Sequence, residues 1–306
     1  MLAVRLNQTA RPDTAGAAVE IVDSPRVSIA APGDAILMVT TAVITRWDAE
    51  AAQPGHLKPI PGAEFAGIVV EVGEAVSTVN LDDLVVVRCV VPTDDGVALQ
   101  RFGSGDLDGG HAEYVRVPHA DETLVRTTAA AEERSVFAGG SASLGIAAAE
   151  AAIKSAGDGP VLVMGCDAAG LSALAWLKHR RGRANTVFAT ESHAAKLAAA
   201  KAYGASPVEP TELAAARPAA VILANGQSMH EIADGSAVIS TDPGSHENAL
   251  PWPTVEQVRR AEMAIRLRQV DLTPLVSTVL PLDQAAEAYR ITIDAPAGAR
   301  SVLLKP

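Results

Sequence analysis

A glycine-containing turn near the middle of the chain has the residue types and the spacing needed to bind a dinucleotide. The run VLVMGCDAAGLSALAWLKHRRGRANTVFATE begins as an apolar strand, turns through Gly165 and Gly170, and ends at Glu191, 21 residues beyond Gly170. Glycines in such a strand–turn–helix let backbone N–H groups and the helix N-terminus approach a pyrophosphate. An acid after the second strand binds ribose hydroxyls and repels a 2′-phosphate, so Glu191 favours NAD(H) over NADP(H).

One residue of this turn opposes the same chemistry. Asp167 stands where the middle glycine of the motif is expected. A carboxylate about 5 Å from a phosphate would repel it by roughly 3 kcal/mol at an effective dielectric constant near 20. Two interpretations therefore stay open, a dinucleotide site with weakened or lost affinity and a strand–helix turn that holds no ligand.

The segments around the turn predict two kinds of structure. Up to about residue 130, short β-branched runs such as AILMVTTAVIT and AGIVVEV alternate with turn residues, which predicts an irregular β domain. Beyond it, apolar runs alternate with Ala-rich helical segments, which is typical of βαβ units and a parallel sheet. Thr254 and Gln257 have the spacing of a capping box and predict the start of a helix, and Gly204 predicts the end of another.

Composition excludes several classes of partner. The chain has 306 residues, of which 48% are hydrophobic and 20% charged, as in a globular protein of about two domains. A formal charge of −11 disfavours nucleic acid and anionic membranes as partners. Only two cysteines are present and they are far apart, so neither a disulfide framework nor a cysteine-rich zinc site is expected. No signal peptide or apolar run of about 18 residues is found, so we expect a cytoplasmic protein that acts on a small molecule.

Four further segments occur in the order found in one protein superfamily. In chain order the segments are PGAEFAGIVVEVGEAVSTV, DGGHAEYVRVP, KLAAAKAYGAS and LPLDQAAEAYRI. Taken with the glycine turn, they give a chain that resembles the medium-chain dehydrogenase/reductase superfamily, in particular its zinc alcohol and polyol dehydrogenase branch. The resemblance implies an α/β fold with a GroES-like, β-rich catalytic domain (1–130 and 270–306). A Rossmann domain with a doubly wound parallel sheet (131–269) would lie between the two parts. It also implies an active site in the cleft between the domains and a homodimer formed through the Rossmann edge strand.

The residues at the family's metal-ligand positions have changed. Thr45 stands at the first ligand position, Ala63 in IPGAEFAG replaces a histidine, and the third ligand position falls near Gly139 or Gly140. None of these side chains is a zinc ligand, and a catalytic zinc needs about three protein ligands. The four-cysteine lobe of the family is also missing from residues 90–107. We therefore expect no zinc.

Several neighbours of the lost metal site persist, and the resemblance assigns roles to them. Arg46 matches a basic position that reaches the cofactor phosphates, and Trp47 replaces a hydroxyl residue that starts the family's proton relay. Without zinc, another group must stabilise the developing alkoxide, and His56 belongs to the pool of candidates, whereas His111 is expected to be structural. The expected catalytic residues are Thr45, Trp47, Asp48, Glu64 and Ser143. The expected cofactor-binding residues are Arg46, Gly165, Asp167, Gly170, Glu191 and Asn225.

Two kinds of function fit these residues. The first is a zinc-independent, NAD(P)(H)-dependent oxidoreductase that interconverts an alcohol and a ketone or reduces an enone. The second is a scaffold of the same family without hydride transfer, namely a pseudoenzyme, a binding protein or a non-redox enzyme that uses the same cleft. The loss of the zinc ligands, the middle glycine and the relay hydroxyl favours the second, whereas Glu191, the two glycines and Arg46 favour the first.

Overall fold

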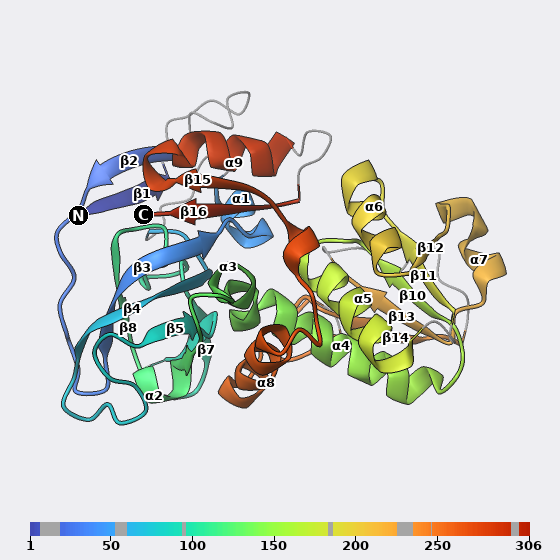
Figure 1. Cartoon of the computed structure of the whole chain (residues 1–306), viewed down its shortest axis with the longest axis horizontal. Helices are drawn as coiled ribbons and strands as arrows, with labels where there is room; N and C mark the ends of the chain where they lie inside the picture. The colour runs from blue at the N-terminus through green and yellow to red at the C-terminus, as the bar shows by residue number, and fades with distance from the viewer. Residues whose placement is uncertain are drawn as a thin grey trace.

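The computed structural model describes residues 1–6, 19–52, 60–93, 96–182, 186–224, 235–245, 247–294 and 300–306. Two lobes are visible, a β-rich lobe that contains both chain ends and an α/β lobe built around a parallel sheet (Figure 1). The helices labelled α3, α4 and α8 lie in the region where the lobes meet. The α/β fold class predicted from the sequence is confirmed.

The β-rich lobe is built on a seven-stranded sheet. Its strands run in the order β15-β16-β3-β4-β5-β9, and β8 pairs with β3. A two-stranded ribbon of β1 and β2 and another of β6 and β7 complete the lobe. The bounds are β1 (Leu2–Leu6), β2 (Val19–Asp23), β3 (Ala35–Val43), β4 (Glu64–Val72), β5 (Leu84–Val87), β6 (Val90–Pro92), β7 (Leu99–Arg101), β8 (Tyr114–Val117), β9 (Leu124–Arg126), β15 (Val276–Pro281) and β16 (Ser301–Lys305).

Strands from both parts of the chain meet in this sheet. The C-terminal β16 pairs antiparallel with β3, with Leu303 opposite Val43. The longest pairing joins β3 to β4 and buries apolar residues on both sides of the sheet, among them Phe65 and Leu37. The chain ends thus share one lobe, as the resemblance implies, while the exact domain boundaries stay a prediction.

The second lobe holds a five-stranded sheet whose strands are all parallel, in the order β12-β11-β10-β13-β14. The bounds are β10 (Val161–Met164), β11 (Val187–Thr190), β12 (Ser206–Pro207), β13 (Ala220–Leu223) and β14 (Ala237–Ser240). Strands β10 and β13 are buried along their whole length because helices cover both faces, which explains their unbroken apolar sequences. The strand order reverses beside β10, and a dinucleotide binds at such a switch point.

Helices and short 3₁₀ turns connect these strands. The helices are α1 (Arg46–Ala51), α2 (Ala120–Thr123), α3 (Glu132–Ser135), α4 (Ser141–Ala156), α5 (Ala168–Arg181), α6 (Ala194–Ala202), α7 (Leu213–Ala216), α8 (Val255–Arg266) and α9 (Ala285–Asp294). The 3₁₀ turns are η2 (Val136–Gly139), η3 (Pro210–Glu212), η4 (Thr273–Leu275) and η5 (Leu282–Gln284).

Two helix boundaries follow the sequence predictions. The Thr254 side chain accepts from the backbone N–H of Gln257 and the Gln257 side chain accepts from the backbone N–H of Thr254, so the predicted capping box of α8 is confirmed. Gly204 follows the C-cap residue of α6 with φ of +91°, a conformation that favours glycine.

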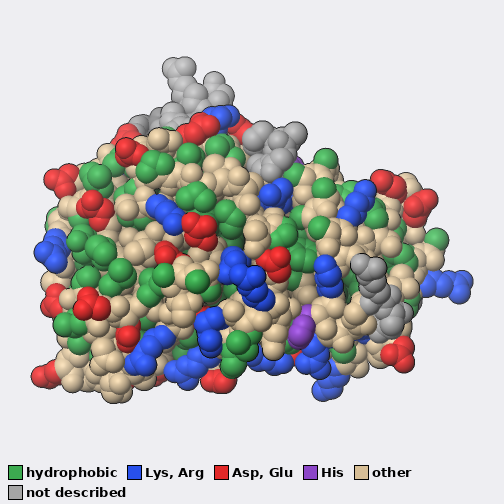
Figure 2. Space-filling model, viewed as in Figure 1, with side chains coloured by type: hydrophobic (Ala, Val, Ile, Leu, Met, Phe, Trp, Pro, Cys, Tyr) green, Lys and Arg blue, Asp and Glu red, His purple; other side chains and the backbone are tan. Residues whose placement is uncertain are grey.

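Lys and Arg side chains gather over the α8 region, although the chain as a whole is acidic. Figure 2 shows Lys and Arg side chains gathered along the lower edge of this face, over the region of α8. Each arginine of α8 is paired with an acid: Arg259 with Glu256, Arg260 with Glu150 and Arg266 with Glu262. These ion pairs leave the edge with little unbalanced charge.

Among the described residues, no single helix combines the length and the apolar composition that a membrane span requires. Residues 132–139 and 141–156 pass that test only when they are joined across a bend of 66°.

Candidate functional site

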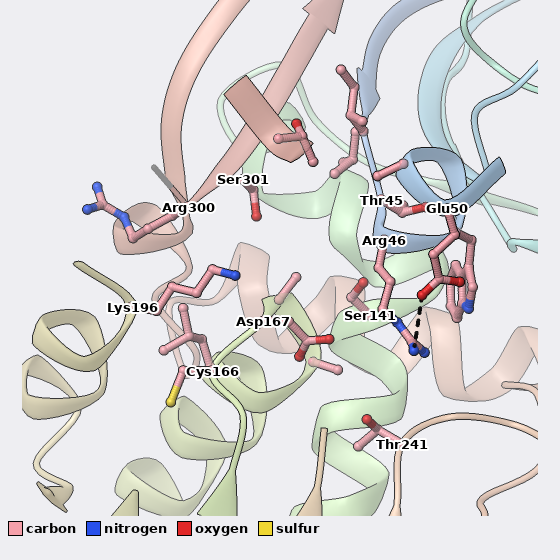
Figure 3. A pocket seen from close by; sticks show the side chains of 18 of the residues that line it. Thr45, Arg46, Glu50, Ser141, Cys166, Asp167, Lys196, Thr241, Arg300 and Ser301 are labelled. Carbon is pink, nitrogen blue, oxygen red and sulfur yellow. Dashed lines mark ion pairs between the residues drawn. The ribbon is translucent and has the colours of Figure 1, made fainter. Parts of the chain in front are cut away.

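A cleft of about 310 Å³ opens where the two lobes meet. The β-rich lobe contributes α1 and its N-cap, together with the last turn of α9 and the start of β16. The α/β lobe contributes the start of α4, the turn between β10 and α5, and one residue of α6. The polar side chains that line the cleft are Thr45, Arg46, Glu50, Ser141, Asp167, Lys196, Thr241, Thr292, Arg300 and Ser301, and Figure 3 shows most of them around a common space.

The glycine turn has the backbone that close approach requires. Gly165 follows β10 with φ of +85°, a conformation that side chains rarely tolerate. A Cβ added to Gly170 would lie 2.2 Å from the carbonyl oxygen of Gly165. Both glycines are therefore explained by the packing of the turn against the first turn of α5, whether or not a ligand binds there.

Asp167 caps the helix whose N-terminus would face a phosphate. Its Oδ1 accepts a hydrogen bond of 2.9 Å from the N–H of Gly170, and its side chain lines the cleft. Desolvation raises the pKa of this carboxyl group, while the Gly170 N–H and the Arg46 and Lys196 charges act in the opposite direction. The sequence predicts a negative charge near the phosphates, and in the structure this carboxyl group already accepts a hydrogen bond from a backbone donor at the helix end.

Glu191 is held at the end of β11 by backbone donors. Its Oε2 accepts from the N–H of Cys166 at 2.8 Å, and its Oε1 accepts from the N–H of His193 at 2.9 Å. These bonds fix the carboxylate beside the glycine turn, at the end of the strand where a ribose would lie. Oε1 also accepts a longer bond of 3.3 Å from the Ser192 hydroxyl, whereas Oε2 can accept a second hydrogen bond from a ribose hydroxyl.

Cationic side chains reach the cleft from three segments far apart in the sequence. Arg46 forms an ion pair of 2.8 Å with Asp242 and a longer one of 3.7 Å with Glu50. Figure 3 shows the Lys196 ammonium directed into the cleft, whereas the Arg300 guanidinium points away from its centre. The cleft therefore presents positive charge beside a helix N-terminus, an arrangement that suits an anionic ligand.

Thr45 and Asp48 hold the backbone around α1. The Thr45 hydroxyl donates to Asp48 Oδ2 at 2.6 Å and accepts from the Asp48 N–H at 3.3 Å, which completes a capping box. Asp48 also accepts from the N–H of Thr45 and from the N–H of Gly62, both at 2.8 Å. Asp48 is buried and lies behind the cleft lining, so the geometry supports the loop-holding role for this acid more than a catalytic one.

Glu64 lies at the start of β4, fully buried behind the cleft. Its Oε1 accepts from the N–H of Ser141 at 2.8 Å and from the Ser141 hydroxyl, while Oε2 has no hydrogen-bond partner among the described residues. Desolvation raises the pKa of Glu64 to about 8. The two Ser141 donors lower this pKa, whereas the nearby acids Asp48 and Asp167 raise it further. Glu64 is thus largely protonated at neutral pH.

Trp47 lines the cleft and also contacts the other lobe. Its ring contacts Trp252 of the other lobe, with centroids 5.4 Å apart at an angle of 57°. The Arg101 guanidinium lies 5.2 Å from the Trp47 ring centre. Arg88 adds a further contact between the lobes by donating from Nε to the carbonyl oxygen of Pro253 at 2.6 Å. The bulk that Trp47 brings to this position therefore serves partly to join the two lobes.

Other predicted site residues lie elsewhere. The Ser143 hydroxyl donates to the carbonyl oxygen of Ala138 at 2.6 Å, and this residue is not part of the cleft lining. His111 is buried, lies between the Tyr289 hydroxyl and the Val43 carbonyl oxygen, and fits the structural role expected for it. Asn225 and His56 lie outside the described residues.

Ser141, Lys196 and Arg300 line the cleft but were missed by the sequence reasoning. Ser141 is the first residue of α4, directly after the two glycines at the third ligand position, and this placement could have drawn attention to it. Lys196 lies five residues after Glu191, on the first turns of α6. Arg300 directly precedes β16, and the pairing of β16 with β3 brings it and Ser301 to the cleft beside residues of α1.

The side chains near the former ligand positions do not fit a zinc ion. The Thr45 hydroxyl is engaged with Asp48, and Ala63 is a buried methyl group. A Cβ added to Gly140 would lie 2.8 Å from Glu64 Oε1 and 3.2 Å from Cys89 Sγ, and a catalytic zinc needs about three protein ligands. Within the described ranges, no group of three or more His, Cys, Asp and Glu side chains is arranged to hold a metal ion.

Comparison with known proteins identifies relatives of both lobes. Residues 31–129 match the family model of the alcohol dehydrogenase GroES-like domain. A probable zinc-binding alcohol dehydrogenase of Mycobacterium tuberculosis is 30% identical over 326 aligned residues, which cover 90% of this chain and 83% of that protein. A medium chain reductase/dehydrogenase of Acremonium sp is 36% identical over 167 residues, or 49% of this chain, and the alignment spans only 56% of that relative's length.

The fold has been seen in solved structures as well. An alcohol dehydrogenase from Thermus sp. ATN1 superposes with a TM-score of 0.82 over the full length of both chains, at 20% sequence identity. At that identity the match establishes the arrangement of both lobes and leaves the chemistry to the residues of the cleft.

Proposed function

Because the chain belongs to the medium-chain dehydrogenase/reductase superfamily, we propose that it is an oxidoreductase that uses a nicotinamide dinucleotide, and NAD(H) in preference to NADP(H), without a catalytic zinc ion. The observation that carries the proposal is the convergence of the glycine turn, the N-terminus of α5 and cationic side chains on one cleft between the lobes. Its substrate is a small alcohol, a ketone or an enone.

The residues that would hold the cofactor come from both lobes. The turn that contains Gly165 and Gly170 lets the pyrophosphate approach the backbone, and Glu191 is oriented toward the ribose position. Arg46 and Lys196 supply positive charge from opposite sides of the cleft. A bound nicotinamide would supply or accept a hydride, and the chain's own residues would bind, orient and protonate the substrate.

The zinc-independent part of the proposal is supported by the side chains at the former ligand positions. Relatives that carry zinc in their names need ligands that Thr45, Ala63 and the glycines at 139 and 140 cannot provide. The Thr45 hydroxyl is also committed to the capping box of α1. Polarisation of a carbonyl group must then come from hydrogen-bond donors that face the cleft.

Replacing Lys196 with glutamine tests the cofactor site. We expect NADH to bind about tenfold more weakly, because a charge-assisted hydrogen bond contributes roughly 1.5 kcal/mol or more. Quenching of tryptophan fluorescence by NADH measures the dissociation constant. Lys178→Gln is the matched control, since Lys178 lies on an exposed part of α5 outside the cleft and should leave the constant unchanged. Equal affinities for both variants would show that the cationic side chain of α6 does not contact the cofactor.

Replacing Asp167 with asparagine tests the charge in the glycine turn. The asparagine oxygen can still accept from the Gly170 N–H, so the cap of α5 is kept while the negative charge is removed. We expect NADH affinity to rise at least tenfold, measured by the same titration. Unchanged affinity would mean that the Asp167 carboxyl group is protonated or lies away from the phosphates in the complex.

The alternative, a family scaffold without hydride transfer, is favoured by a specific observation. Asp167 already caps the N-terminus of α5, and Arg46 is already paired with Asp242, so two groups that would contact a pyrophosphate have partners inside the chain. Failure of both NADH and NADPH to stabilise the protein thermally would favour this alternative. The homodimer inferred from the family resemblance is proposed for either function.

A further inference from the structure

Of the hydroxyl groups that line the cleft, two are hydrogen-bonded to a buried carboxyl group behind the lining. The first pair is Thr45 with Asp48, and the second is Ser141 with Glu64. The Asp48 carboxyl group uses both oxygens, because it accepts from two backbone N–H groups and from the Thr45 hydroxyl. The Thr45 hydroxyl also accepts from the Asp48 N–H, so this pair is fully used in holding the backbone.

The second pair has hydrogen-bonding capacity to spare. Glu64 Oε1 accepts from the N–H and the hydroxyl of Ser141, while Glu64 Oε2 has no partner among the described residues and the side chain is completely buried. No Lys or Arg forms an ion pair with Glu64 among the described residues, which leaves a carboxylate there uncompensated. Removal of the Ser141 hydroxyl would therefore change the cleft surface and would also take one hydrogen-bond donor from the buried Glu64 carboxyl group.

The groups that face Glu64 from neighbouring elements favour its neutral form. Asp48 of α1 and Asp167 of the glycine turn are both acids, and the buried thiol of Cys89 follows β5. Among the described residues, the N–H and the hydroxyl of Ser141 are the donors that stabilise the carboxylate. Burial and the neighbouring acids outweigh these two donors, so they favour the protonated form of an acid that lies directly behind a cleft-lining hydroxyl.

We propose that Ser141 is the catalytic proton donor of the cleft, and that Glu64 supplies the proton through it. The proposal rests on the oxidoreductase function proposed above. In it, Ser141 and Glu64 take over the roles of the missing metal ion and of the relay hydroxyl that Trp47 replaces. During reduction of a carbonyl compound by a reduced nicotinamide, the substrate carbon receives the hydride. In the donor step the Glu64 carboxyl group carries its proton on Oε1 and donates it to Ser141 Oγ, so that the Ser141 hydroxyl turns from Glu64 to the substrate oxygen. The substrate oxygen forms an O–H bond as the Ser141 O–H bond breaks, and Ser141 Oγ recovers the proton from Glu64 Oε1. Because Glu64 is buried, a proton from solvent in the cleft returns to it through Ser141, and the reverse direction runs the same steps backwards.

Infrared difference spectroscopy of the ligand-free protein tests the state of the buried acid. The C=O band of a protonated carboxyl group should be present at neutral pH, vanish in Glu64→Gln and shift in Ser141→Ala. For the cleft, the carbonyl band of bound cyclohexenone should lie at lower frequency in the wild type than in Ser141→Ala. A carbonyl band that does not differ between these proteins would overturn the role of Ser141, and a Glu64 that is fully ionised at neutral pH would overturn the supply of the proton.

Kinetics of NADH-dependent cyclohexenone reduction provide the second readout. We expect kcat to fall about a hundredfold in Ser141→Ala and in Glu64→Gln, a usual size for loss of general acid catalysis, with little change in KM for NADH. Ser141→Thr should restore most of the loss. In the wild type kcat should fall as pH rises above about 8, whereas the Glu64→Gln profile should be flat there. Ser135→Ala is the control, because it removes a buried hydroxyl that lies outside the cleft and has no hydrogen-bond partner among the described residues. This variant should leave kcat unchanged.

The two proposals fail in different ways. Normal NADH binding combined with full activity of Ser141→Ala would contradict the proton path and leave the oxidoreductase function intact. Absence of NADH binding would contradict the oxidoreductase function, while the infrared bands would still report whether Glu64 is protonated and coupled to Ser141.

Discussion

Replacing Glu64 with glutamine should remove a large pH dependence of the protein's stability. Burial raises the pKa of the Glu64 carboxyl group from 4.5 to about 8, so the folded state holds a proton that the unfolded state releases. The wild type therefore loses stability as pH rises from 4.5 toward 8, by an amount on the order of 4 kcal/mol. Urea unfolding at a series of pH values across this window measures the effect.

The sign of the difference between the two proteins should depend on pH. Near pH 5 the glutamine variant should be no more stable than the wild type, because its amide N–H groups take the position of Oε2, which has no described partner. At about pH 8 and above it should be the more stable protein. Glu71→Gln, on an exposed position of the same strand, is the matched control and should keep the wild-type pH dependence. Parallel curves for the wild type and Glu64→Gln would contradict the assignment.

Replacing Gly170 with alanine should be among the most damaging single changes in the α/β lobe. The added methyl group would lie 2.2 Å from the Gly165 carbonyl oxygen and 3.2 Å from Ala224 Cβ. Relief requires the β10–α5 turn to move as a whole, so we expect a loss of about 3 kcal/mol in the free energy of unfolding. NADH binding should also be lost, because the same turn forms the pyrophosphate position.

Gly33→Ala provides the control for this substitution. Nothing lies within 4 Å of a Cβ added at Gly33, so the free energy of unfolding should change by about 0.5 kcal/mol or less. Chemical unfolding of both variants, followed by circular dichroism, gives the comparison. Equal stability of Gly170→Ala and Gly33→Ala would contradict a tight contact between α5 and the end of β10.

The sequence predicts most of the fold because its signals are local. Alternation of apolar runs with Ala-rich segments predicts the parallel sheet, and the Thr254–Gln257 spacing predicts the start of α8. The glycine turn is also local, since Gly165, Asp167 and Gly170 lie within six residues. The placement of the C-terminal strand in the first sheet followed from the family resemblance, because no local pattern contains that information.

The candidate site is less predictable because its contacts join distant segments. Arg300 reaches the cleft only through the pairing of β16 with β3, and Ser141 meets Glu64 across 77 residues of sequence. The resemblance predicts a role for Ser143, but the Ser143 hydroxyl donates to the carbonyl oxygen of Ala138 in the preceding turn. The serine that lines the cleft is Ser141, two residues earlier in the chain. Residue type at a matching position thus indicates a neighbourhood, whereas the partner of each side chain depends on packing.

Asp167 shows how a residue can be interpreted correctly in part. Its position near the phosphates followed from the motif, and the structure places it in the cleft. Its role as the N-cap of α5 was not foreseen, although aspartate is a favoured residue at that position. The cap explains why an acid can occupy a glycine position without destabilising the helix. Replacing Asp167 can therefore have two effects, a change in helix stability where the cap is lost and a change in affinity for an anionic ligand through the lost charge.

The proposed function requires that the cleft bind a nicotinamide dinucleotide without a metal ion. Isothermal titration calorimetry of chelator-treated protein with NADH and NADPH, with zinc measured in the same sample, tests it most directly. We predict saturable binding of one NADH per chain with no zinc in the protein, and weaker binding of NADPH because Glu191 faces the ribose position. Binding of neither dinucleotide, or NADH binding that requires one zinc ion per chain, would contradict the account.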